Sequence, residues 1–153
     1  MPKNALEKLA FDYFKLFAQL ESVMKSRGMT RAAGATNKRG HRNIEIAWNE
    51  LAKLLGKDFP ERIDQQSEAA KYIFKYPPLK QVFLTDRVQW VRSKQSKDTT
   101  LALLLYLGRL RNNLFHGAKF DGTFSDGWAA PARSETLLGH GVTILQAIKH
   151  ELK

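Results

Sequence analysis

Cysteine is absent from the 153-residue sequence, which excludes disulfide bonds, thiolate zinc sites and cysteine nucleophiles. Long apolar runs are also missing, since no segment reaches the roughly 18 residues that a membrane-spanning helix needs. Charged residues break every apolar stretch near the start of the chain, unlike in a signal peptide. We therefore expect a soluble, cytoplasmic protein that has no membrane partner.

Two further kinds of site lack their sequence signals. No pair of the 4 histidines has the spacing of a metal site. A glycine-rich loop of the phosphate-binding type is missing as well. The sequence therefore predicts neither a metal nor a cofactor.

Acidic residues are few, because 15 Asp and Glu stand against 25 Lys and Arg, a formal net charge of +10. Such an excess attracts polyanions, although membrane surfaces and acidic proteins would be attracted too. Six of the basic residues lie between Lys25 and Arg42 with no acidic residue among them. This glycine-containing basic loop, about residues 28–42, is either a solvated loop or a nucleic-acid contact. The candidate RNA-binding residues in it are Arg31, Lys38, Arg39 and Arg42.

What is present is the composition of one globular domain, with 43% hydrophobic and 26% charged residues. The apolar periodicity predicts helices over about 5–27, 44–55 and 60–76. Their ends are marked by capping or breaking residues: Asn4, Gly28, Asn43, Gly56, Pro60 and Pro77. The stretch 79–91 would suit short helices or extended chain, and its context favours helices.

A central helix follows, capped at Asp98 and running to His116. Its first half is apolar on nearly every face, which indicates a buried element. A loop over 117–133 comes next, and Ser134 caps a last amphipathic helix. The predicted fold is all-α, a bundle of four to six helices that forms one domain over residues 1–153. No β-hairpin is expected.

The segment that closes the central helix carries the most chemistry: Arg111-Asn112-Asn113-Leu114-Phe115-His116-Gly117. At about 100° per residue, Gly108, Asn112 and His116 form a ridge opposite the leucine stripe, and Arg111 flanks it. Arginine binds phosphate oxygens, asparagine can orient a hydroxyl or a histidine, and histidine transfers protons near neutral pH. Because RNA supplies its own nucleophile in the 2′-hydroxyl, this set of residues is suited to RNA cleavage.

Arg-Asn, three residues and His116, followed by Gly117, resembles the signature of the HEPN superfamily ("higher eukaryotes and prokaryotes nucleotide-binding"). The resemblance implies an up-and-down helical bundle. It also implies a metal-independent endoribonuclease that leaves a 2′,3′-cyclic phosphate and a 5′-hydroxyl. It implies that Arg111 and His116 are the catalytic pair and Asn112 the accessory polar residue. It also implies a homodimer whose two motifs line one cleft, and a role as a toxin or phage-defence effector with a possible antitoxin partner.

Two other positions bear on the resemblance. Many members of the superfamily carry an acidic or polar residue on an earlier helix, for which Glu45, Asn49 and Glu50 are the candidates. One subgroup has a tyrosine two residues after the histidine, which an antitoxin modifies. Ala118 fills that place here, which argues against this form of regulation. The dimer has a chemical reason as well, since transesterification uses two proton-transfer groups and each chain offers one motif histidine.

Other interpretations of the same residues stay open. His116 before Gly117 is also a common way to end a helix. The chain would then be a non-catalytic HEPN-like module that binds RNA or a protein, or a helical interaction domain for acidic partners. Trp48, Trp90 and Trp128 are interpreted as core or interface anchors in preference to base-stacking platforms.

Overall fold

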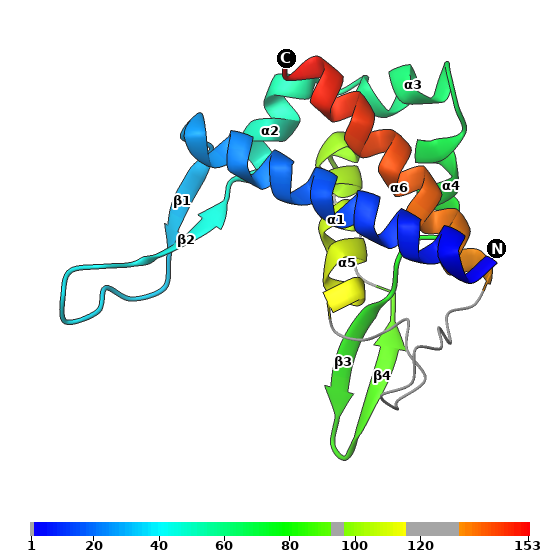
Figure 1. Ribbon diagram of the computed structural model, residues 1–153. Helices are drawn as coiled ribbons and strands as arrows, with labels where there is room; N and C mark the ends of the chain where they lie inside the picture. The colour runs from blue at the N-terminus through cyan, green and yellow to red at the C-terminus, as the bar shows by residue number, and fades with distance from the viewer. Residues whose placement is uncertain (1, 93–96, 116–131) are drawn as a thin grey trace.

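The computed structural model describes residues 2–92, 97–115 and 132–153, and 63% of these residues are helical. Six helices and two two-stranded antiparallel hairpins make up this described part (Figure 1). In chain order the elements are α1 (Pro2–Ser26), β1 (Thr30–Ala33), β2 (Asn43–Ile46), α2 (Trp48–Leu55), α3 (Phe59–Asp64), α4 (Ala69–Lys75), β3 (Lys80–Leu84), β4 (Arg87–Val91), α5 (Thr99–Phe115) and α6 (Ala132–Glu151).

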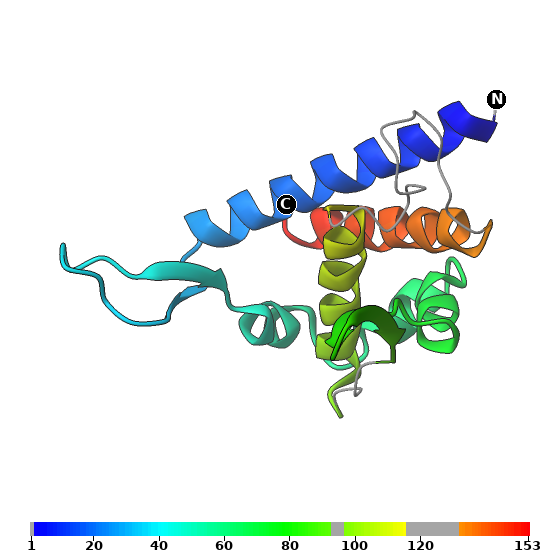
Figure 2. The ribbon, with the colours of Figure 1, turned by 90° about the horizontal axis from the view of Figure 1, so that it is seen from below.

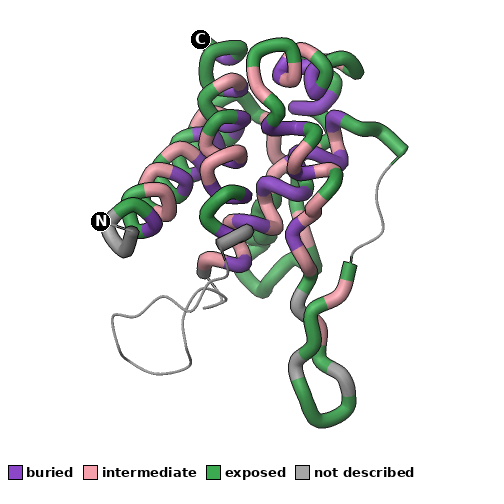
Figure 3. Tube along the Cα trace, turned by 90° about the vertical axis from the view of Figure 1, so that its right-hand side faces the viewer, coloured by how far each residue is buried: buried purple, intermediate pink, exposed green. Residues whose placement is uncertain are grey.

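The central position predicted for α5 is confirmed. Helices α1 and α6 lie against each other, and α5 runs between α2 and the α3–α4 pair (Figure 2). Leu103, Leu104 and Leu107 are completely buried on α5, and they join one apolar cluster that extends from Leu6 to Leu152. The buried faces of the helices point inward, whereas the β3–β4 hairpin projects from the bundle (Figure 3).

Several helix ends lie where the sequence predicts them. Gly28 has φ +74°, and the amides of Gly28 and Met29 donate to the carbonyls of Lys25 and Met24. This pair of bonds is a Schellman motif, which needs the left-handed conformation that glycine adopts freely. Asp98 caps α5, because its Oδ1 accepts the amide N–H of Leu101 at 3.0 Å.

Other helix boundaries differ from the prediction. The first helix begins at Pro2 and the last at Ala132, each two residues before the expected cap at Asn4 or Ser134. The single helix expected over 60–76 is two helices, α3 and α4. Asp64 explains the break, because its Oδ1 accepts the amides of Ala70 and Lys71 at 3.1 and 3.2 Å and so begins a new helix.

The strictly all-α prediction is wrong, because two hairpins replace expected loop and helix. Residues 43–46 are strand β2, paired with β1, and not the start of the second helix. Residues 80–91 form the β3–β4 hairpin and not short helices. Its two-residue turn places Thr85 at φ +48°, the only non-glycine residue of the described part with a positive φ. Strand-forming residues on both sides of such a turn favour the extended chain.

One buried contact fixes α5 against the outer helices. The Tyr13 hydroxyl of α1 donates to the Leu107 carbonyl of α5 at 2.5 Å. Burial raises the pKa of Tyr13 well above its usual value, so the hydroxyl stays protonated and can donate. Gly141 of α6 makes room for the ring, since a Cβ there would lie 2.6 Å from its Cε2 atom. The Leu107 carbonyl lies one turn before Arg111, so this contact positions the motif.

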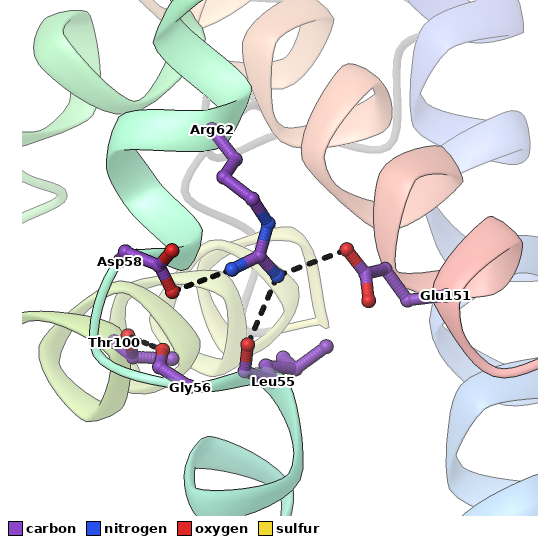
Figure 4. A network of polar contacts seen from close by, with 6 residues as sticks. All are labelled: Leu55, Gly56, Asp58, Arg62, Thr100 and Glu151. Atoms are coloured by element: carbon purple, nitrogen blue, oxygen red, sulfur yellow. Dashed lines mark hydrogen bonds and ion pairs between the residues drawn. The ribbon is translucent and has the colours of Figure 1, made fainter.

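A polar network ties the ends of α2 and α6 to α3, near the start of α5 (Figure 4). Arg62 donates to Asp58 at 2.6 Å and to Glu151 and the Leu55 carbonyl at 2.9 Å. The hydrogen bond with Glu151 raises the pKa of the Arg62 guanidinium. Thr100 Oγ1 donates to the Gly56 carbonyl at 2.6 Å, which attaches the start of α5 to the same region. In the described part of the chain, no helix is both long and apolar enough to cross a bilayer.

Candidate functional site at the end of helix α5

Arg111 and Asn112 lie in the last turn of α5, and both are half-buried. Arg111 Nη1 donates to Asn112 Oδ1 at 3.1 Å, which holds the two side chains as one polar unit. The guanidinium also lies 5.9 Å from the centre of the Phe17 ring and 3.9 Å from a Glu21 carboxylate oxygen of α1. The ring and the carboxylate orient a cation that still faces solvent.

A hollow of about 240 Å³ opens beside this pair. Gly108, Arg111 and Asn112 of α5 form one wall, as the helical-wheel argument predicts for the ridge. The remaining lining comes from three other elements: Phe17 and Glu21 of α1, Arg31, Glu45 and Ile46 of the β1–β2 hairpin, and Trp48 of α2. A Cβ on Gly108 would meet no atom within 4 Å, so the glycine does leave open space on this side of the helix.

Arg111 also borders a second hollow of about 390 Å³ along α1. The two hollows share Phe17, Glu21 and Arg111, and the second adds Phe14, Ala18, Ser22 and Lys25. The second is near the lower end of the roughly 300–1,000 Å³ that small-molecule pockets occupy, and the first is smaller. Arg111 at their junction can therefore contact a ligand that extends through both, such as a short stretch of a polymer.

The basic loop is the distal part of the β1–β2 hairpin, which projects from the bundle (Figure 1). The base of this hairpin lines the hollow through Arg31, Glu45 and Ile46. Asn37 organises it, since its Oδ1 accepts the amides of Arg39 and His41 at 2.9 and 3.0 Å. Arg31 pairs with Glu45, and Arg42 donates to the Gly34 carbonyl at 3.1 Å. Lys38 and Arg39 are exposed, and within the described residues their side chains make no hydrogen bond or ion pair.

The structure thus separates the candidate residues. It brings Arg31 together with Arg111 and Asn112, while Lys38, Arg39 and Arg42 lie in the loop at residues 34–42. Of the acidic or polar candidates, Glu45 lines the hollow, from a strand and not from a helix. Asn49 and Glu50 are exposed at the start of α2 and line neither hollow. His116 lies outside the described residues, as do most of the loop 117–133 and Trp128.

Two residues that the sequence reasoning missed shape the site. Glu21 faces Arg111. The sequence feature that could have indicated it is a carboxylate one helical turn after Phe17, on a largely apolar side of α1. Asn113 was named in the motif segment without a role of its own, but it is 8% exposed and its Nδ2 donates to the Leu79 carbonyl at 3.1 Å. Asn113 therefore attaches the end of α5 to the base of the β3–β4 hairpin.

The formal charges of the hollow's lining balance, with Arg31 and Arg111 against Glu21 and Glu45. The Arg111–Glu21 pair is at 3.9 Å, and partly exposed pairs of this kind contribute only about 0–1 kcal/mol. A phosphate oxygen that binds Arg111 would therefore break only a weak ion pair with Glu21. Within the described part, no three His, Asp or Glu side chains gather in a group that could hold a metal ion.

Comparisons with known proteins return no match for this chain, whether the comparison is with family models, curated proteins or solved structures.

Proposed function

We propose that this protein is a metal-independent endoribonuclease of the HEPN type, which works in the cytoplasm as a toxin or phage-defence effector. The observation that carries the proposal is the Arg111–Asn112 unit, which opens onto a hollow at the base of a basic hairpin. A helical bundle with a buried motif helix accords with the resemblance of the motif to that superfamily.

In the proposed reaction the 2′-hydroxyl oxygen attacks the adjacent phosphorus, and the bond from phosphorus to the 5′ oxygen breaks. Arg111 neutralises the non-bridging oxygens of the phosphate, whose charge increases in the transition state. Asn112 orients the ribose hydroxyl or the histidine. His116 transfers a proton, from the 2′ oxygen or to the leaving 5′ oxygen. The products are a 2′,3′-cyclic phosphate and a 5′-hydroxyl, and no water or metal is consumed.

The proposal includes a homodimer. Two proton transfers are needed, and one motif histidine per chain provides one of them. A two-fold axis near the end of α5 would place two motifs in one cleft. Leu105 favours this arrangement, because it is 46% exposed and lies three residues before Gly108 on the same side of the helix.

The experiment compares cleavage of a 5′-labelled single-stranded RNA by wild type and by His116→Ala, in excess EDTA. We expect wild type to cleave at an unchanged rate when EDTA is added, and His116→Ala to lose at least about 100-fold in rate. Equal rates in the two proteins would refute the catalytic assignment, and loss of activity in EDTA would refute the metal-free mechanism. Salt-dependent RNA binding without cleavage by either protein would indicate a non-catalytic RNA-binding module instead.

A further inference from the structure

The β3–β4 hairpin presents two aromatic rings to solvent. Phe83 is 71% exposed and Trp90 is 37% exposed. The register pairs residue 83 with 88 and residue 81 with 90, so Phe83 and Trp90 lie diagonally across one face of the hairpin. Within the described residues neither ring contacts another aromatic side chain. Rings exposed in this way contribute little to a hydrophobic core, so their burial does not explain why they are there.

The hairpin is mostly positive. Arg92 is exposed just after β4, two residues beyond Trp90, whereas the exposed Lys80 and Arg87 lie on the other face of the hairpin. Asp86 in the turn is the one acidic residue of the hairpin. Exposed apolar rings alone would suit many partners, but rings on a positively charged hairpin suit a ligand that is both planar and negatively charged. Unpaired nucleotides have both properties, since the base stacks on an aromatic ring and the phosphate pairs with Lys or Arg.

The hairpin is attached directly to the proposed catalytic segment. Asn113, the neighbour of Asn112, donates to the carbonyl of Leu79, the residue before β3. The hollow at Asn112 and the base of this hairpin therefore adjoin neighbouring residues of α5 that face about 100° apart, and an RNA strand that contacts both would pass from one side of the helix to the other. Because stacking needs free base faces, the hairpin would select single-stranded over double-stranded RNA.

We propose that the β3–β4 hairpin is a base-stacking platform, in which Phe83 and Trp90 hold two unpaired bases of the RNA substrate. The inference rests on the proposed function to the extent that RNA is the ligand. It adds the substrate class, which is single-stranded RNA, and it reassigns Trp90 from an anchor to a binding residue.

The test measures affinity for a short oligouridylate by fluorescence anisotropy, in EDTA and with His116→Ala as the parent so that cleavage does not interfere. Trp90→Ala and Phe83→Ala should each weaken binding about tenfold or more, whereas Trp90→Phe keeps a stacking ring and should stay within about threefold. Binding of a blunt RNA duplex should change less than about threefold in all three. Circular dichroism establishes that each variant is folded.

Unchanged oligouridylate affinity in both alanine variants would overturn the proposal. The alternative occupant of this face is a second copy of the chain, which analytical ultracentrifugation tests. If Trp90→Ala turns a dimer into a monomer, the face is an interface between two copies and the proposal fails. This test and the test of the nuclease proposal can fail independently. RNA binding that depends on Trp90, by a protein that never cleaves RNA, would support the platform and refute the nuclease. RNA cleavage that does not depend on Trp90 would support the nuclease and refute the platform.

Discussion

The two hairpins leave the same helical bundle but carry different chemistry. The β1–β2 hairpin ends in a loop, residues 34–42, that presents Lys38 and Arg39 without partners in the described part of the chain. The β3–β4 hairpin closes in two residues and presents Phe83 and Trp90. Charge attracts a polyanion from a distance and is screened by salt, whereas stacking acts on contact and depends little on salt. The hairpins should therefore contribute to RNA binding in ways that salt can separate.

Two adjacent asparagines at the end of α5 also contact different hairpins. Asn112 faces the hollow beside the β1–β2 hairpin, and Asn113 is bonded to the base of the β3–β4 hairpin. One position in sequence, about 100° around the helix, is enough to separate a residue of the proposed site from a residue that holds the structure.

The largest expected effect concerns these two asparagines. Asn112→Ala should lower the cleavage rate about 100-fold, because a misplaced reacting group costs that much, and should leave stability within about 0.5 kcal/mol. Asn113→Ala leaves the Leu79 carbonyl without its donor and should lower the free energy of unfolding by about 1–2 kcal/mol. Urea denaturation and cleavage kinetics on both variants measure the contrast. If both variants lost activity equally and lost stability equally, the two asparagines would not have different roles.

The second effect concerns the charge of the β1–β2 hairpin. If Lys38 and Arg39 each contact a phosphate as proposed, replacing both by alanine removes two contacts, each worth about 0.7 in the salt slope for a single strand. Affinity for single-stranded RNA at about 0.1 M salt should fall roughly 25-fold, and the slope of log affinity against log salt should flatten by about 1.4. The matched control replaces the exposed Lys53 and Lys57, which lie on and just after α2. An equal loss in the control would mean that net charge alone attracts RNA.

The third effect concerns the open space on α5. Gly108→Ala should raise the free energy of unfolding by about 0.5–1 kcal/mol, since alanine favours helix and its Cβ would meet nothing within 4 Å. The same methyl group narrows the hollow and should slow RNA cleavage. Gly139→Ala on α6 meets the same empty surroundings away from the hollow, so it should stabilise the protein at unchanged activity. Full activity in a stabilised Gly108→Ala would show that the ridge is not used.

The smallest effect concerns the turn of the β3–β4 hairpin. Thr85 is β-branched and has φ +48°, a conformation that glycine adopts at lower cost. Thr85→Gly should stabilise the hairpin by about 0.5 kcal/mol, seen as roughly twofold slower amide exchange in its ladder. Asp86→Gly is the control, because Asp86 does not have a positive φ and glycine there should speed exchange. Slower exchange in the control than in Thr85→Gly would contradict the assignment of strain to Thr85.

The sequence predicted the helices more successfully than the hairpins, for a physical reason. Helices of 17 to 25 residues repeat an apolar face several times, as Leu103, Leu107 and Leu110 do on α5. The strands have four or five residues, too few for alternation to stand out. Neither hairpin is closed by an Asn-Gly or Asp-Gly turn, the strongest local signal for one. The sequence prediction therefore assigned most of residues 43–46 to the helix that follows them.

The candidate site was likewise predicted in part: its relations within one helix were predicted, and its contacts between elements were not. The helical wheel correctly placed Gly108 and Asn112 on one open side of α5 and Arg111 beside them, because those relations are local. The approach of Glu21 and Glu45 to Arg111 and Asn112 depends on how α1 and the β1–β2 hairpin pack against α5. Contacts across so many residues follow from the whole fold, and a single sequence carries no short-range pattern for them.

The chemistry of the product ends tests the central claim most directly. Wild-type protein is incubated with a single-stranded RNA in excess EDTA, and the ends of the fragments are identified by mass spectrometry. The account predicts a 2′,3′-cyclic phosphate on one fragment and a 5′-hydroxyl on the next, together with complete resistance of the same RNA when a 2′-deoxy sugar precedes the scissile phosphate. Fragments that carry a 3′-hydroxyl and a 5′-phosphate, or cleavage at the 2′-deoxy position, would contradict it.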